Sequence, residues 1–137
     1  MMMISAMILA AALGATQEDE ASLTVTVDGL EPEGAVMMAL FASAESWSGG
    51  EPVAGRRIAV EGSTVTTEFA SLPAGDYAIR LFHDVDGDGE LDTNLMGVPS
   101  EPFAFSNNAL GSFGPAAWED AVFTVAPGGN SHTLDMR

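Results

Sequence analysis

The segment from residue 84 to residue 92 has the residues in this chain best suited to chemistry. It reads Asp-Val-Asp-Gly-Asp-Gly-Glu-Leu-Asp, with carboxylates at alternating positions around two glycines. A tight loop with this spacing wraps oxygen ligands around Ca²⁺. Without a cation, carboxylates about 4 to 6 Å apart would repel one another by roughly 1–4 kcal/mol per pair. The segment therefore predicts a calcium-binding loop with five ligand residues: Asp84, Asp86, Asp88, Glu90 and Asp92.

The order of these ligands is similar to that of an EF-hand loop, although the surroundings differ. The three leading aspartates match ligand positions one, three and five, Glu90 would offer its backbone carbonyl at seven, and Asp92 matches nine. Position twelve is Leu95, where an EF-hand has a bidentate glutamate. Asn94, Glu101 or water could supply the missing oxygen. We expect a structural site with a dissociation constant on the order of 10⁻⁴–10⁻³ M.

Two other interpretations of the same segment stay open. In the first, the aspartates cap backbone amides in a solvated turn, and the domain is purely structural and binds no metal. In the second, His83, Asp84 and Glu101 lie on one loop face and form the site of a hydrolase. The serines at 106 and 112 lack the Gly-x-Ser-x-Gly surroundings of a hydrolase nucleophile. We therefore expect a protein that is not an enzyme, and keep the hydrolase as the alternative.

The charge and the missing cysteines exclude several classes of function. The 137-residue chain has 20 acidic residues against four arginines, no lysine, and a formal net charge of −16. Binding to a nucleic-acid backbone requires a basic patch, so nucleic acid is excluded as a partner. With no cysteine, the chain has no thiol catalysis, zinc–thiolate site or iron–sulfur cluster. A small domain of this kind depends on its core and hydrogen bonds, and a metal could add to them.

The first residues predict export. Residues 1–15 are uncharged and apolar, and the composition turns acidic at residue 18. This run is too short to span a bilayer, and it matches the hydrophobic region of a secretory signal followed by small residues. We expect a signal peptide over residues 1–17, a single domain over 18–137, and a bacterial periplasmic or secreted location. After cleavage we expect a monomer without membrane insertion, whose partner is a protein or an envelope component.

The remaining chain reads as β-structure. Short stretches with alternating apolar residues are separated by turn residues, and no segment keeps a helical period for three turns. This pattern predicts a single all-β sandwich of about seven strands, Ig-like or prealbumin-like in type. The expected strands are 22–28, 35–41, 57–60, 64–69, 77–83, 121–125 and 132–136.

One region departs from the strand pattern. From residue 84 to about 117 we expect no strand, only one long ordered loop, and such loops are commonly functional. Its aromatic residues would either anchor the loop to the sandwich or form a binding platform, and we favour anchors. These residues are Phe103, Phe105, Phe113 and Trp118.

Six blocks of the sequence carry a resemblance to a known family: Gly29-Leu30, Leu72–Ala78, His83–Asp92, Gly97–Glu101, Phe105–Ala109 and Phe113–Pro115. They resemble an uncharacterised bacterial exported family, domain of unknown function family 2141. The resemblance covers nearly all of the chain after the predicted signal, and it implies an exported β-sandwich without indicating an activity. The Leu-Pro-Ala-Gly-Asp-Tyr turn is also similar to turns of prealbumin-like sandwich domains.

Overall fold

The computed structural model describes residues 20–85, 101–110 and 115–136. These residues form short strands joined by turns, two one-turn α-helices and one 3₁₀ turn. Within this part of the chain, no helix is long and apolar enough to cross a membrane. The elements are β1 (Glu20–Asp28), β2 (Ala35–Phe41), α2 (Ala44–Trp47), β3 (Ala54–Ala59), β4 (Val65–Pro73), β5 (Gly75–Asp84), β6 (Phe103–Phe105), η1 (Ser106–Asn108), α3 (Trp118–Ala121), β7 (Phe123–Val125) and β8 (Gly128–Asp135).

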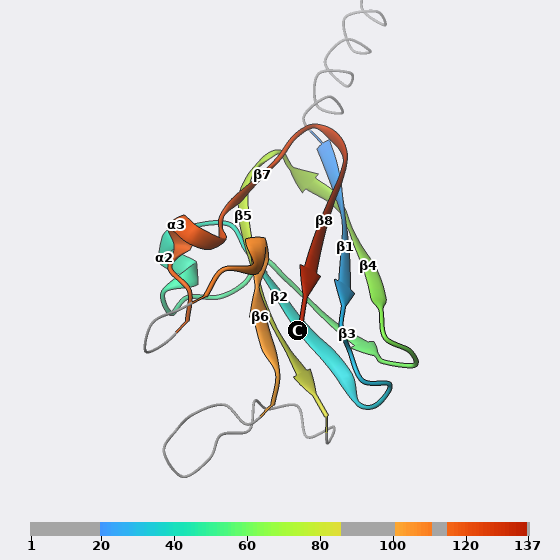
Figure 1. The fold of residues 1–137 in the computed structure, drawn as a ribbon. Coiled ribbons are helices and arrows are strands. Elements are labelled where there is room, and N and C mark those ends of the chain that lie inside the picture. The colour runs from blue at the N-terminus through green and yellow to red at the C-terminus, as the bar shows by residue number, and fades with distance from the viewer. Residues whose placement is uncertain (1–19, 86–100, 111–114, 137) are drawn as a thin grey trace, which may run out of the picture.

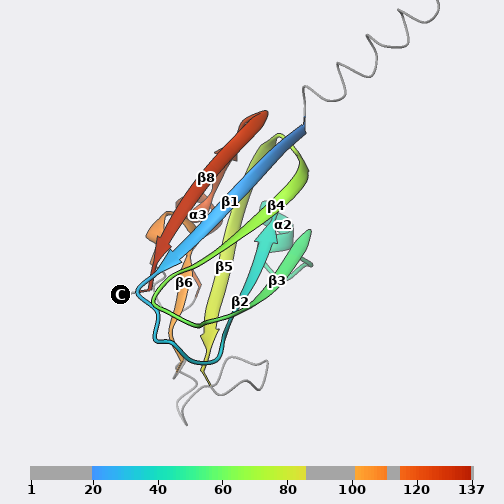
Figure 2. The same cartoon turned by 90° about the vertical axis from the view of Figure 1, so that its right-hand side faces the viewer.

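The strands form two sheets that pack face to face (Figure 1). The smaller sheet has the order β4-β1-β8, with β1 antiparallel to β4 and parallel to β8. The larger sheet has the order β3-β2-β5-β6, and β7 pairs with the first residues of β5. Figure 2 shows the smaller sheet in front of β5, β2 and β3. The all-β sandwich predicted from the sequence is confirmed.

The main core lies between the sheets and follows from the alternation of side chains along each strand. Leu23, Val25 and Val27 of β1 are buried, while the residues between them are partly exposed. Successive side chains of a strand point to opposite faces, so one face of β1 packs on the other sheet. In β5 the same rule buries Ile79 and Leu81 in this core. It also sends Arg80 to the outer face.

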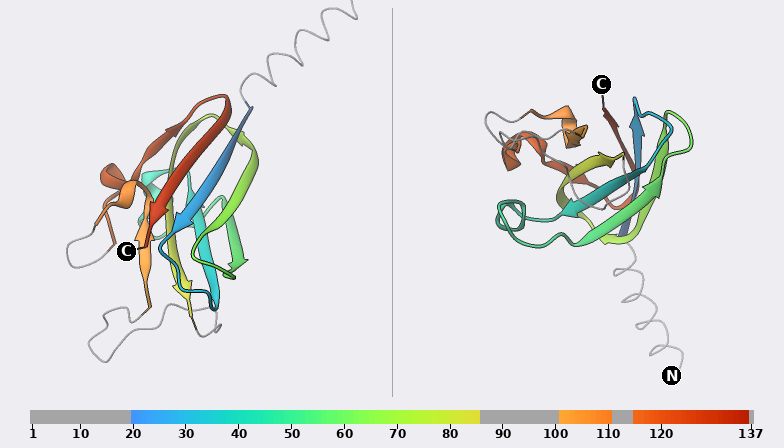
Figure 3. Two further views of the ribbon diagram at one scale, coloured as in Figure 1. Left: turned by 45° about the vertical axis from the view of Figure 1, so that its right-hand side comes forward. Right: turned by 90° about the horizontal axis from the view of Figure 1, so that it is seen from below.

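A second apolar cluster covers part of the outer face of the larger sheet. Trp47 of α2 contacts Phe41 and Phe105 edge to face, with ring centroids 5.3 and 6.0 Å apart. The Ser43 side chain caps α2 by accepting a hydrogen bond from the Ser46 amide. Both helices lie on the side of the larger sheet away from the smaller one (Figure 3). Phe105 is therefore a buried anchor, the role that the sequence favoured.

The observed elements differ from the predicted ones within the predicted long loop and in the segment that follows it. β6 lies in this region and pairs with β5, opposite Arg80 and Phe82. Residue Ala121 belongs to α3, not to a strand. The last strand begins at Gly128 instead of His132, because parallel pairing with β1 reaches back to Ala21. β6 and the first residues of β8 depend on pairing with strands that are distant in the sequence, and the local pattern does not contain this pairing.

The surroundings of His132 in β8 predict that the free energy of unfolding depends on pH. Its ring stacks on Phe123 with centroids 4.1 Å apart, and its Nε2 accepts a hydrogen bond of 3.1 Å from the Asn107 amide. Burial lowers the pKa of His132 below its usual value of 6.5. A group whose folded-state pKa is lowered contributes stability above its unfolded pKa and loses it as the pH falls. We therefore expect the free energy of unfolding to fall as the pH drops from about 6.5 to 5.

A matched variant separates this histidine from the other titrating groups. In His132→Gln, the amide oxygen can accept the same hydrogen bond but does not titrate, and acidic side chains titrate mainly below pH 5. Urea unfolding at several pH values should give a smaller decrease between pH 6.5 and 5 for this variant than for the native chain. Equal decreases in the two proteins would contradict the role of His132.

Candidate metal centre

The predicted calcium ligands begin at the last residue of β5. Asp84 ends this strand and is 0% exposed. It pairs with Ala35 of β2, the first residue of that strand. The other predicted ligands, Asp86, Asp88, Glu90 and Asp92, lie outside the described residues. Their convergence on one point therefore stays a prediction.

The structure brings together the two chain segments that flank residues 86–100. The Val85 amide donates a hydrogen bond of 2.8 Å to Glu101 Oε2, and the His83 amide donates one of 2.8 Å to the Pro102 carbonyl. Glu101 is buried, with 8% of its surface exposed. The structure thus places a second buried carboxylate beside the residue that follows Asp84. Glu101 is one of the residues that the sequence offered for the missing calcium ligand.

The turn before β2 packs against the backbone at the end of β5. Gly34 has a φ of +63°, a conformation that glycine adopts without strain. A Cβ atom placed on it would overlap the backbone oxygen of Asp84 and lie 2.8 Å from Val85 Cα. The start of β2 can therefore approach Asp84 this closely only with glycine at residue 34.

His83 is held on the opposite face of β5. It pairs with Val36, one residue along from the Ala35–Asp84 pair, so its side chain and that of Asp84 point to opposite sides of the sheet. The ring is 2% exposed, and Nε2 lies 2.6 Å from the Glu33 carbonyl. A carbonyl oxygen only accepts, so Nε2 carries a proton and donates. The side chains of His83 and Asp84 therefore do not share one face of β5, whereas Glu101 is held beside Val85.

Within residues 20–85, 101–110 and 115–136, no group of three or more His, Asp and Glu side chains is arranged to hold a metal ion. Of the five predicted calcium ligands, only Asp84 belongs to this part of the chain, so the metal site stays a prediction. Asp and Glu oxygens are the ligands that Ca²⁺ prefers, so the donor types fit this ion.

Comparison with known proteins identifies the family. The family model of uncharacterised proteins conserved in bacteria, DUF2141, matches residues 25–133. The chain belongs to this family. No curated protein matches the chain. The matched DUF2141 region contains the whole predicted calcium segment and every described strand of the larger sheet.

The sequence interpretation missed one group of side chains that the fold of this DUF2141 protein brings together. The Arg80 guanidinium lies over the rings of Phe41 and Trp47, 5.0 and 4.4 Å from their centroids. These three residues come from β5, β2 and α2. The signal in the sequence was an arginine between apolar residues of a strand, in a chain with only four arginines.

Proposed function

We propose that this protein is an exported, non-enzymatic β-sandwich module that binds Ca²⁺ through the segment following β5. The observation that carries the proposal is the closed base of this segment, where Asp84 is buried and Val85 is hydrogen-bonded to Glu101. The proposed ligands are Asp84, Asp86, Asp88, the backbone carbonyl of Glu90, and Asp92.

Burial of carboxylates at the base supports a cation there. Removing a carboxylate from water is costly unless hydrogen bonds or a positive charge compensate. Both Asp84 and Glu101 are buried, and further acidic residues follow within a few positions. A carboxylate has about four acceptor positions, so Glu101 can accept the Val85 N–H and also bind a cation. In our proposal Glu101 supplies the oxygen that the glutamate at position twelve gives in an EF-hand.

The wider role follows from the acidic surface and the first residues of the chain. We propose that residues 1–17 direct export and that residues 18–137 act as a monomer in the periplasm or outside the cell. The bound ion offsets repulsion among the acidic side chains and holds the segment after β5 as a surface for a partner protein or an envelope component. The net charge of −16 favours attraction of cations over binding of anionic polymers.

Calorimetric titration of the chain without residues 1–17 tests the proposal. We expect one site for Ca²⁺ with a dissociation constant on the order of 10⁻⁴–10⁻³ M. Asp84→Asn should weaken binding by about tenfold or more, because a charged ligand is lost. Glu68→Gln removes one negative charge from an exposed site on β4 and should leave the affinity within about twofold.

Circular dichroism of each variant would verify that it folds. Absence of a binding heat up to about 10 mM Ca²⁺ would leave the purely structural acidic domain as the better account. Equal weakening by Asp84→Asn and Glu68→Gln would show general charge attraction without a defined site.

A further inference from the structure

Arg80 is a partly desolvated cation at the centre of the outer apolar cluster. Its Nη2 donates a hydrogen bond of 2.8 Å to the Trp47 carbonyl, while its Nε is buried and has no hydrogen-bond partner in the structure. Burial lowers the pKa of Arg80 from its usual value, although arginine stays charged at neutral pH. Among the described residues, aromatic rings and a carbonyl surround this guanidinium, and no carboxylate pairs with it.

A cleft of about 670 Å³ opens beside Arg80, between α2 and α3. This volume lies in the range of small-molecule sites. Trp47 and Trp118 form aromatic walls, with centroids 6.3 Å apart and planes inclined by 64°. Trp47 is fixed by a hydrogen bond of 2.8 Å from its Nε1 to the Ala116 carbonyl. Figures 1 and 3 show the two helices side by side on the outer face of the larger sheet.

The chemistry of this cleft selects a class of ligand. A guanidinium presents planar N–H donors that match a carboxylate, and the match is stronger where water is partly excluded. Aromatic walls favour a ligand with a flat ring face. Glu119 also lines the cleft, and its negative charge repels a ligand with two negative charges, such as phosphate, more strongly than a monocarboxylate.

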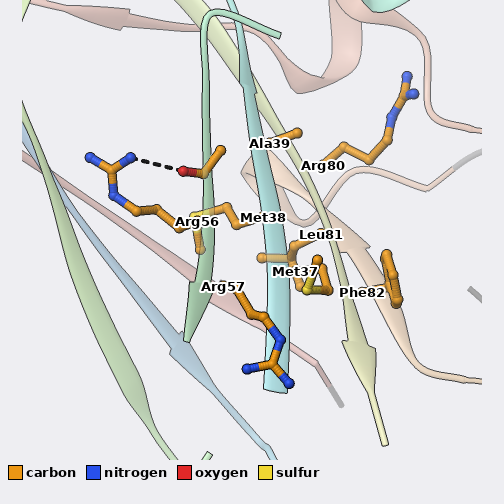
Figure 4. Close-up of a pocket in the computed structure, with 9 residues that line it drawn as sticks. Met37, Met38, Ala39, Arg56, Arg57, Arg80, Leu81 and Phe82 are labelled. Carbon is orange, nitrogen blue, oxygen red and sulfur yellow. Dashed lines mark hydrogen bonds between the residues drawn. The ribbon is translucent and has the colours of Figure 1, made fainter. Parts of the chain in front are cut away.

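A second hollow on the same face does not have this combination. It contains Met37, Phe82 and the stems of three arginines, and its volume is about 430 Å³. Figure 4 shows the guanidinium groups of Arg56, Arg57 and Arg80 pointing in three different directions. They therefore do not converge on one anion there. Arg57, exposed on β3, instead serves as a control for general charge effects.

We propose that the cleft between α2 and α3 binds a small monocarboxylate carried on a flat ring, with Arg80 as its counter-charge. The half-buried Trp118 offers a face for the ring to stack on, and Trp47, which Trp118 contacts edge to face, lies beside it. An aromatic acid has such a flat ring, and a uronic acid offers the apolar C–H face of its pyranose ring in its place. The site lies on different residues from the calcium ligands, so it does not rest on the proposed function.

Intrinsic fluorescence tests this site directly, because the chain has only two tryptophans and both line the cleft. Benzoate and glucuronate would be titrated at constant ionic strength, each against a neutral counterpart, benzyl alcohol and glucose. We expect saturable changes with a dissociation constant of about 1 mM for at least one of the two acids. Its neutral counterpart should bind about tenfold more weakly. The tighter acid identifies the ligand class as aromatic or sugar-derived.

Variants separate the site from general effects of charge. Arg80→Gln should weaken the acid by about tenfold or more, and Arg57→Gln should leave it within about twofold. Trp118→Ala changes a half-buried wall and provides a second test, read by calorimetry, if Arg80→Gln does not fold. This variant should also weaken binding by about fivefold or more. The proposal would be overturned if neither acid saturates below about 10 mM, if the neutral counterpart binds as tightly, or if a folded site variant binds like the native chain.

Discussion

Adding about 10 mM Ca²⁺ should raise the midpoint of thermal unfolding by about 5–10 °C, and excess chelator should reverse the rise. An ion that binds only the folded state stabilises it by RT ln(1 + [L]/Kd), about 1.4–2.7 kcal/mol when the ion is at 10 to 100 times its dissociation constant. For a domain of this size, each kcal/mol moves the midpoint by a few degrees. Differential scanning calorimetry with and without chelator measures the shift.

Two controls test whether the rise in the unfolding midpoint comes from calcium bound at a defined site. Salt alone stabilises a chain with a net charge of −16 by screening its repulsion, so ionic strength is matched with NaCl. Asp84→Asn should lose most of the calcium-dependent rise, whereas Glu68→Gln should keep it. A rise that NaCl reproduces, or that survives in Asp84→Asn, would contradict a calcium site at the end of β5.

Gly34→Ala should lower the free energy of unfolding by about 3 kcal/mol or more. An alanine at a φ of +63° is strained by about 1–2 kcal/mol. Its Cβ would also overlap the backbone of Asp84 and Val85, and backbone cannot rotate away as a side chain does. Urea denaturation of the two proteins measures the difference. Because the overlap displaces Asp84, calcium affinity should fall in the same variant.

Gly62→Ala is the matched control. A Cβ atom at this glycine has no neighbour within 4 Å, so the same change of residue should alter stability by less than about 1 kcal/mol. A similar loss in both variants would mean that the close approach of Gly34 to Asp84 does not govern the stability of this region.

The sequence predicts the strands whose side chains alternate in polarity or are buried throughout. The buried residues of β1 are those expected from alternation, and β2 has the predicted bounds Ala35–Phe41. β1 has one face toward the main core, so a two-residue period is present in its sequence. β2 is apolar throughout because the main core covers one of its faces and the outer apolar cluster lies on the other. The difference at β3, predicted as 57–60 and observed as Ala54–Ala59, also has a physical reason. β3 is an edge strand whose Arg56 lies over the ring of Phe69, 4.3 Å from its centroid, where an apolar residue would be expected.

The short elements of the outer face could not be predicted in the same way. β6 has three residues and exists because it pairs with β5. Asn107 and Asn108 in η1 have positive φ values, and the Asn107 side chain donates hydrogen bonds to the carbonyls of Asp120 and Val122. Such contacts join residues that are far apart in the chain. A local pattern of polarity does not contain them.

The chemistry of the candidate calcium site was predictable, but its surroundings were not. Alternating aspartates and glycines indicate oxygen ligands for a cation from the residue types alone. The burial of Asp84 and the hydrogen bond from Val85 to Glu101 depend on tertiary contacts, and this hydrogen bond joins residues 16 positions apart in the chain. The Arg80 cleft was missed for the same reason, since its walls come from α2, β5 and α3.

A crystal structure of the protein grown with about 10 mM Ca²⁺ tests the central claim most directly. Our account predicts one anomalous-scattering peak beside the end of β5, with oxygens of Asp84, Asp86, Asp88, Glu90 and Asp92 at about 2.3–2.6 Å from it. Carboxylates directed separately into solvent, with no peak among them, would contradict the account.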